Sequence, residues 1–152
     1  MEQLSLVDWS YHYAKNKDTV TRSITNIDKK IDQLLITHKT KTQLYYILES
    51  FSNTNNKNNI TEILKQVKAA KDDPKQFFVI VVYNTKENLH YLIKNWQSLI
   101  DYPNLSAIFA NPQSNTEKRW MIFPFTHAKI TEKSSLELGL KSLAEGVEEY
   151  NK

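Results

Sequence analysis

Six polar residues follow the two most hydrophobic segments of the chain, where an α/β protein binds its ligand. Residues 77–83 and 105–110 are almost continuously apolar and predict two buried strands. Open α/β sheets bind ligands beyond the carboxyl ends of their strands, and the first turn of a following helix offers N–H groups to an anion. The two predicted strands are followed by Asn84-Thr85 and by Asn111, and Lys86, Lys118 and Arg119 could add positive charge nearby. They predict a crevice for a small anionic ligand, although a helix cap and a turn would also explain the two asparagines.

Histidine is the second residue type that could carry a reaction, and His127 is the candidate among the four. It follows Phe125 and lies near Lys129, where it could carry a proton or contact a phosphate; a structural role is the alternative. The chain has no HExxH motif, no pair of histidines four residues apart and no cysteine. The sequence therefore predicts no zinc site, disulfide or cysteine nucleophile.

Glycine is too scarce for the common nucleotide-binding loops. The only two, Gly139 and Gly146, lie in the last predicted helix, so neither GxGxxG nor GxxxxGK[ST] can be written. This argues against a classical dinucleotide-binding or P-loop enzyme and leaves open a nucleotide bound in another way; we expect no cofactor. The two glycines indicate either a close helix contact or tolerated weak points.

The second half of the chain predicts alternating helices and strands. Capping-box spacing and apolar positions three and four apart predict a helix over 60–71, and a second from the cap at Asn84 to just before Tyr102. The strands at 77–83 and 105–110, with the second of these helices between them, predict a βαβ unit. We expect a further strand over 119–125, with Pro124 at an edge or bulge, and a closing amphipathic helix over 134–150.

The first fifty residues support two interpretations after a helix over 8–22. Either a long helix continues through Leu34, or 34–38 and 43–48 form a hairpin with 24–28 as a third strand. Enrichment in Thr, Tyr and Ile favours strands. The whole predicts an α/β (mixed α+β) fold: one three-layer domain with a mixed sheet, an N-terminal helix, a hairpin or meander, a βαβ unit and a C-terminal helix. An Asn-rich segment at 52–59 is expected to be an exposed loop.

With the hairpin, the element order over residues 8–84 resembles the core of the restriction-endonuclease-like nucleases, the PD-(D/E)XK group. The resemblance implies that acids on two neighbouring strands hold a Mg²⁺ or Mn²⁺ ion that activates water for phosphodiester hydrolysis. The matching positions are Asp32 and Glu49, the latter in Glu49-Ser50-Phe51. The lysine of the motif is absent and no Pro-Asp pair includes Asp32, so the resemblance implies a degenerate site.

The charge and hydropathy of the chain indicate which partners and which compartment to expect. The net charge of +3 comes from lysine, since Arg22 and Arg119 are the only arginines, and this is poor support for nucleic-acid binding. No apolar run could span a membrane and the N-terminus is not typical of a signal peptide, so we expect a soluble cytoplasmic protein. The leading hypothesis is a non-enzymatic binding or interaction module for a partner protein or a second copy. The alternatives are a divergent or degenerate nuclease that uses a metal ion and a protein that binds a small anionic ligand at the strand-end crevice.

Overall fold

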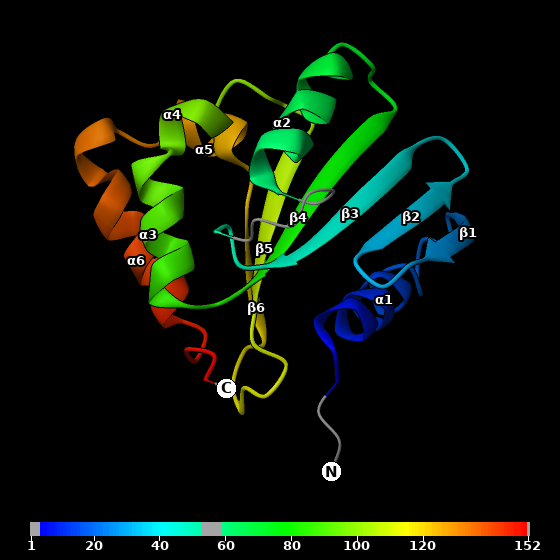
Figure 1. The fold of residues 1–152 in the computed structure, drawn as a ribbon, viewed down its shortest axis with the longest axis horizontal. Coiled ribbons are helices and arrows are strands. Elements are labelled where there is room, and N and C mark those ends of the chain that lie inside the picture. The colour runs from blue at the N-terminus through cyan, green and yellow to red at the C-terminus, as the bar shows by residue number, and fades with distance from the viewer. Residues whose placement is uncertain (1–3, 53–58, 152) are drawn as a thin grey trace.

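The architecture was obtained as a computed structural model, which describes residues 4–52 and 59–151 (Figure 1). All but the two ends of the loop predicted at 52–59 lie outside the described residues. The elements in chain order are α1 (Leu6–Lys17), β1 (Ile24–Lys29), β2 (Gln33–His38), β3 (Thr42–Glu49), α2 (Ile60–Ala69), β4 (Gln76–Tyr83), α3 (Lys86–Lys94), α4 (Trp96–Leu99), β5 (Leu105–Ala110), β6 (Arg119–Ile122), α5 (Pro124–Ile130), a 3₁₀ turn (Lys133–Ser135) and α6 (Leu136–Glu145).

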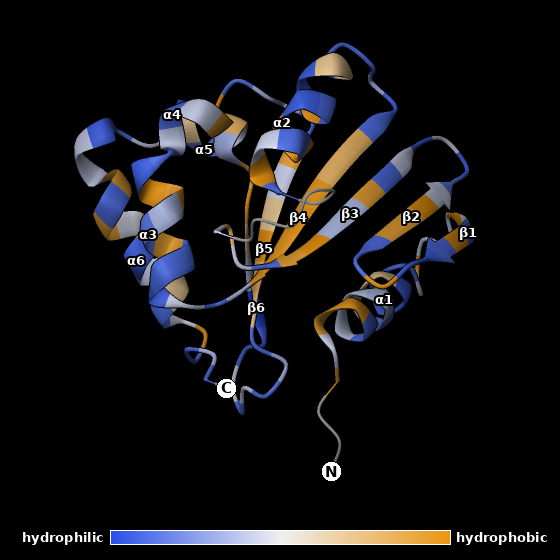
Figure 2. Ribbon diagram, in the orientation of Figure 1, coloured by the Kyte–Doolittle hydropathy of each residue, from blue (hydrophilic) through white to orange (hydrophobic). Residues whose placement is uncertain are grey.

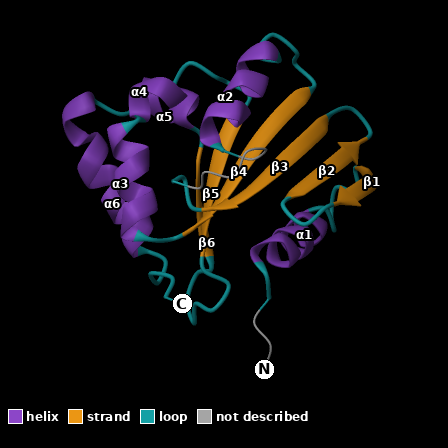
Figure 3. Ribbon diagram, in the orientation of Figure 1, coloured by secondary structure: helices purple, strands orange, loops and turns teal. Residues whose placement is uncertain are grey.

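One mixed six-stranded sheet runs in the order β1-β2-β3-β4-β5-β6 (Figure 3). β1, β2 and β3 form an antiparallel meander, β3, β4 and β5 are parallel, and β6 is antiparallel to β5. The three-strand interpretation of the first fifty residues is therefore confirmed and the long helix is wrong. The parallel strands β3, β4 and β5 end at one edge of the sheet.

Helices cover the two faces of the sheet unequally, so the fold has three layers. α1 alone packs on one face, where Leu6, Trp9 and Ala14 meet inward residues of β2 to β5. The other helices lie on the opposite face over the larger core (Figure 1). The central strands are the most hydrophobic part of the ribbon, as expected of strands covered on both faces (Figure 2). The predicted α/β fold is thus observed.

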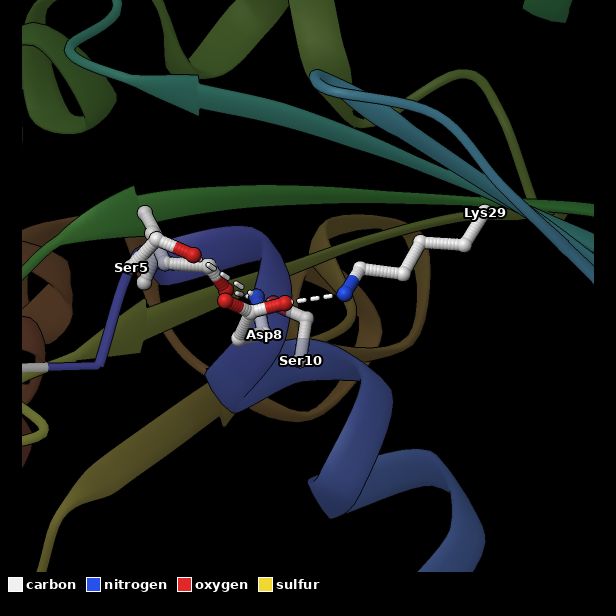
Figure 4. Close-up of polar contacts among 5 residues, drawn as sticks. Ser5, Asp8, Ser10 and Lys29 are labelled. Atoms are coloured by element: carbon white, nitrogen blue, oxygen red, sulfur yellow. Dashed lines mark hydrogen bonds and ion pairs between the residues drawn. The ribbon is translucent and has the colours of Figure 1, made fainter.

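α1 is held to the edge of the sheet by polar contacts at both of its ends. The hydroxyl of Ser5 accepts from the backbone N–H of Asp8, and the Asp8 carboxylate forms an ion pair with Lys29 of β1 (Figure 4). At the other end, the Asp18 carboxylate accepts from the backbone N–H groups of Ser23 and Ile24, where β1 begins. α1 spans Leu6–Lys17, shorter than the predicted 8–22 at its C-terminal end because Asp18 binds ahead to β1 instead of continuing the helix.

Two predicted elements of the second half end earlier than expected. The helix after β4 breaks at Asn95, whose side-chain amide donates to the Tyr91 carbonyl and competes with the helical hydrogen bonds. The strand predicted at 119–125 ends at Ile122, and Pro124 occupies the first turn of α5, where its missing N–H costs nothing. None of the helices in the described part of the chain has both the length and the hydrophobicity that crossing a bilayer demands.

The C-terminal helix α6 ends at Glu145, and residues 146–150 leave it to cross the end of the sheet. No close helix contact is present at its glycines. No atom outside the helix's own backbone and the flanking residues lies within 4 Å of the place where a Cβ of Gly139 would stand, and only the Leu143 carbonyl oxygen, at 3.4 Å, approaches that of Gly146. Gly139 is therefore a tolerated weak point in the helix interior.

Replacing Gly139 by alanine should stabilise the protein. The added methyl group meets no obstacle and alanine loses less backbone entropy, so we expect the free energy of unfolding to rise by about 1 kcal/mol and Tm by about 2–4 °C. Thermal unfolding followed by circular dichroism measures this. Gly146→Ala, at the C-cap, should change stability by less than about 0.5 kcal/mol. A loss of stability in Gly139→Ala would show that the site is not open.

Candidate functional site

The crevice predicted at the ends of the parallel strands is filled by the chain's own C-terminal segment, residues 146–150. The side-chain amide of Asn84, 4% exposed, donates to the carbonyl oxygens of Ala144, Val147 and Glu148 at 3.0–3.3 Å. Its Oδ1 accepts from the indole N–H of Trp120 at 2.9 Å. The side-chain hydrogen bonds of Asn84 are therefore all made to other groups of the protein.

The rest of the segment is fixed by the neighbouring strands. The Asn111 side chain donates to the Glu148 carbonyl at 3.1 Å, and Tyr150 donates its backbone N–H to the carbonyl of Asn84. The rings of Tyr150 and Tyr83 stack with centroids 3.7 Å apart. Burial, followed by the hydrogen bond between the Tyr83 and Tyr150 hydroxyls, raises the pKa of Tyr83 above its ordinary value. An external ligand at this crevice would have to displace these contacts.

The N-terminus of α3 does receive an anion, but the anion belongs to the protein. Thr85, not Asn84, is the N-cap: its hydroxyl accepts from the Asn88 N–H, and Asn84 is instead drawn into the crevice. The backbone N–H of Lys86 donates to the Glu149 carboxylate at 3.0 Å. The favourable field of a helix N-terminus explains this position of the carboxylate.

Lys118 and Arg119 contact other parts of the protein and not the strand-end crevice. The Lys118 ammonium donates to the carbonyl oxygens of Pro112 and Ser114, which closes the loop between β5 and β6. The Arg119 guanidinium lies 4.9 Å from the centroid of the Tyr13 ring, on the α1 side of the sheet. Asn84, Asn111 and the segment they hold therefore form one cluster, and these two basic side chains lie outside it.

The larger cavity lies between α3 and α6, immediately beside the filled crevice. Its volume is about 670 Å³, and we refer to it as the α3/α6 groove. Asn84, Thr85 and Lys86, three of the six residues predicted for ligand binding, line it. The complete lining is Asn84, Thr85, Lys86, Leu89, His90, Ile93, Glu137, Lys141, Ala144, Glu145, Val147, Glu148 and Glu149.

The groove has an apolar floor and an acidic rim. Half-buried or buried aliphatic side chains from α3, α6 and the segment after α6 form the floor: Leu89, Ile93, Ala144 and Val147. The lining includes four glutamates against two lysines, so with His90 neutral its charge is negative although the chain as a whole is positive. One lysine, Lys141, forms an ion pair with Glu137 at 3.2 Å. The net negative charge of the lining therefore comes from the other three glutamates.

The two acids of the nuclease resemblance, Asp32 and Glu49, lie at the same end of the sheet, in the β1–β2 connection and at the end of β3. The backbone N–H of Ile47 in β3 donates to the Asp32 carbonyl, two residues before Glu49. The strand position opposite Asp32 is thus occupied by an isoleucine that is 6% exposed. Glu49 is exposed and has a φ of 66°, because a bulge ends β3 there. Among residues 4–52 and 59–151, no group of three or more His, Asp or Glu side chains is placed to hold a metal ion.

The motif position that would hold the nuclease lysine contains Phe51. Its ring is 2% exposed and stacks on Tyr91, with centroids 4.8 Å apart. Its backbone N–H donates to the buried side chain of Asn88, which also donates to the carbonyls of Glu49 and Tyr83. This part of the chain is therefore built into the core and offers no ammonium group to a phosphate.

His127 lies on α5 and contacts the core. Its ring packs edge-on against Trp96 with centroids 5.7 Å apart, and its Nε2 is 3.2 Å from the Thr131 hydroxyl. Partial burial lowers its pKa below the usual value. These contacts match the structural role that was the alternative for this residue.

Sequence reasoning missed the groove between α3 and α6. The signal available was the pair of amphipathic patterns in the two helices, which marked Leu89, Ile93 and Val147 as inward. The pattern could not tell that these side chains leave an open space, because that depends on the spacing of two helices far apart in the sequence.

No family model matches this chain, and no curated protein and no solved structure matches it significantly.

Asn84→Ala should cost about 2–4 kcal/mol of unfolding free energy, because it leaves the indole N–H of Trp120 and several carbonyl oxygens without their partner. Urea denaturation followed by tryptophan fluorescence measures the loss. Asn26→Ala, the same substitution at an exposed position of β1, should change stability by less than about 0.5 kcal/mol. Equal effects of the two substitutions would contradict the role given to Asn84.

Proposed function

We propose that this chain is a non-enzymatic interaction module that binds a basic, amphipathic segment of a partner protein in the α3/α6 groove. The observation that carries the proposal is the open, acidic-rimmed and apolar-floored groove, next to a strand-end crevice that the protein fills itself. An amphipathic helix laid between two helices is a common mode of peptide recognition.

The apolar floor supplies the driving force for such binding. Leu89 and Ile93 lie one turn apart on α3, and Ala144 faces them from α6. Burying aliphatic surface of this kind contributes roughly 25 cal/mol per Å². Beside the groove, Leu138 of α6 is 75% exposed, and a bound segment could cover it as well.

The acidic rim supplies the preference for a basic partner. Glu145, Glu148 and Glu149 surround the floor, and Lys86 is the only lysine of the described lining that forms no ion pair with a side chain. An acidic rim speeds association with a basic partner and repels acidic segments that could compete for the groove. The overall charge of +3 makes this local reversal of sign more selective, because basic segments are repelled elsewhere.

Two designed amphipathic peptides with the same leucine stripe, one with lysine and one with glutamate at its polar positions, test the proposal. Titration followed by ¹H–¹⁵N NMR should show the lysine peptide shifting the amide signals of Leu89, Ile93 and Ala144, while the glutamate peptide leaves them in place. The affinity should fall as salt is added. Signals that move for neither peptide, or a second copy of this chain bound at the groove in sedimentation experiments, would contradict the proposal.

A matched pair of charge reversals tests whether the peptide binds in the α3/α6 groove. Glu145→Lys on the rim should weaken binding of the lysine peptide about three- to tenfold. Glu132→Lys makes the same change at an exposed residue outside the groove lining and should leave the dissociation constant nearly unchanged.

The degenerate nuclease remains a second candidate, favoured by the observed order of α1, three antiparallel strands, α2 and a parallel β4. The buried Phe51 in the lysine position leads us to expect no turnover. Labelled DNA and RNA incubated with Mg²⁺ or Mn²⁺ should stay intact. Metal-dependent cleavage that is lost in both Asp32→Asn and Glu49→Gln would instead establish a divergent nuclease.

A further inference from the structure

A second cavity opens on the other face of the sheet, where the end of α1, the start of β1 and the β2–β3 turn meet. Its volume is about 370 Å³, and its lining includes Lys17, His38, Lys41 and Tyr45. It shares no residue with the α3/α6 groove, so what it binds is independent of the proposed function.

The hydroxyl of Tyr45 is the unusual group in this cavity. The residue is 2% exposed and lines the cavity, and among the described residues its hydroxyl makes no hydrogen bond. A tyrosine hydroxyl in a cavity wall can donate a hydrogen bond to a ligand that enters the cavity. The next residue, Tyr46, points to the opposite face and donates to Gln66. Burial, with a smaller contribution from Tyr13, raises the pKa of Tyr45, so its hydroxyl keeps its proton and can donate to a ligand.

The one carboxylate in the lining is already satisfied. Asp18 accepts from the hydroxyls of Thr21 and Ser23 and from two backbone N–H groups, each at 2.9–3.0 Å. Although desolvation opposes them, the hydrogen bonds from Ile24 and Ser23 hold the pKa of Asp18 well below its usual range. Asp18 therefore stays ionised, and its oxygens are occupied by donors of the protein.

His38 is fixed as the wall of the cavity by the same network. Its Nδ1 lies 2.7 Å from the Ser23 hydroxyl, which itself binds Asp18, and its Nε2 lies 2.7 Å from the Gln43 side-chain oxygen. The imidazole ring is held at both nitrogens, so the polar lining around Tyr45 is rigid before a ligand arrives.

Two lysines, Lys17 and Lys41, belong to the lining of the cavity. The ammonium groups of Lys17 and Lys41 lie 5.8 Å and 5.4 Å from the ring centroids of Tyr13 and Phe77. Apart from the satisfied Asp18, every charged side chain in the lining is a lysine.

We propose that this cavity binds a phosphate group, with the Tyr45 hydroxyl and the ammonium groups of Lys17 and Lys41 as its donors. A hydroxyl donor and two cations around a small space suit a compact oxyanion with several acceptor oxygens. The volume admits either free phosphate or the phosphoryl end of a small phosphomonoester.

Titration of the ¹⁵N-labelled protein with inorganic phosphate, glycerol 3-phosphate and acetate tests the proposal. Phosphate or the phosphomonoester should shift the amide signals of His38 and Tyr45 saturably, and the tighter of the two identifies free phosphate or a phosphoryl group as the ligand. Acetate should bind more weakly than either. Acetate binding as tight as phosphate, or signals that do not saturate, would overturn the proposal.

Adjacent tyrosines provide the matched control. Tyr45→Phe removes one hydroxyl while keeping the buried ring, and should weaken phosphate binding about tenfold. Tyr46→Phe makes the same change on the opposite face and should leave binding unchanged. Lys41→Gln, an exposed substitution with no risk to the core, should weaken binding at least threefold. Equal effects of the two tyrosine substitutions, or no effect of Lys41→Gln, would contradict the assigned donors.

Discussion

The side-chain amide of Asn84 is the contact on which the functional surface depends. It stands at the end of the central strand β4 and joins the C-terminal segment to the indole of Trp120 on β6. An unpaired amide at this depth would be costly, so the segment and the strand end stabilise each other. Because the segment is fixed there, the Glu149 carboxylate reaches the N-terminus of α3 and the wall of the α3/α6 groove is complete.

This arrangement divides the molecule into two chemically different sides. The crevice where open α/β sheets commonly bind small ligands is used for internal packing. The acidic groove between α3 and α6 lies beside it, and the donor-lined cavity near Tyr45 lies across the sheet. The single helix α1 makes the second cavity possible, because it covers the sheet face only in part and ends where Asp18 binds β1.

The regular elements could be predicted from the sequence because their signals are local. The strand at 105–110 and the helix beginning at Ile60 were placed correctly from apolar periodicity and capping residues. The role of Asn84 could not be predicted, since a cap and a buried cross-link use the same residue type and differ only in what lies 60 residues away. The predicted end of α6 is wrong for the same reason. The apolar pattern continues to Tyr150, but tertiary hydrogen bonds end the helix at Glu145. Element order alone matches Asp32 and Glu49 to the nuclease acids, but it cannot show that the residue two positions after Glu49, Phe51, is buried in the core.

Hydrogen exchange of the C-terminal amides tests the central claim most directly. The backbone N–H groups of Val147 and Tyr150 donate to Ala144 and Asn84 within a packed segment. The account predicts that they exchange with protection comparable to that of core amides in β5, since opening them requires release of the Asn84 cluster. Exchange at the rate of an unstructured chain would contradict it, because the strand-end crevice would then be open to a ligand.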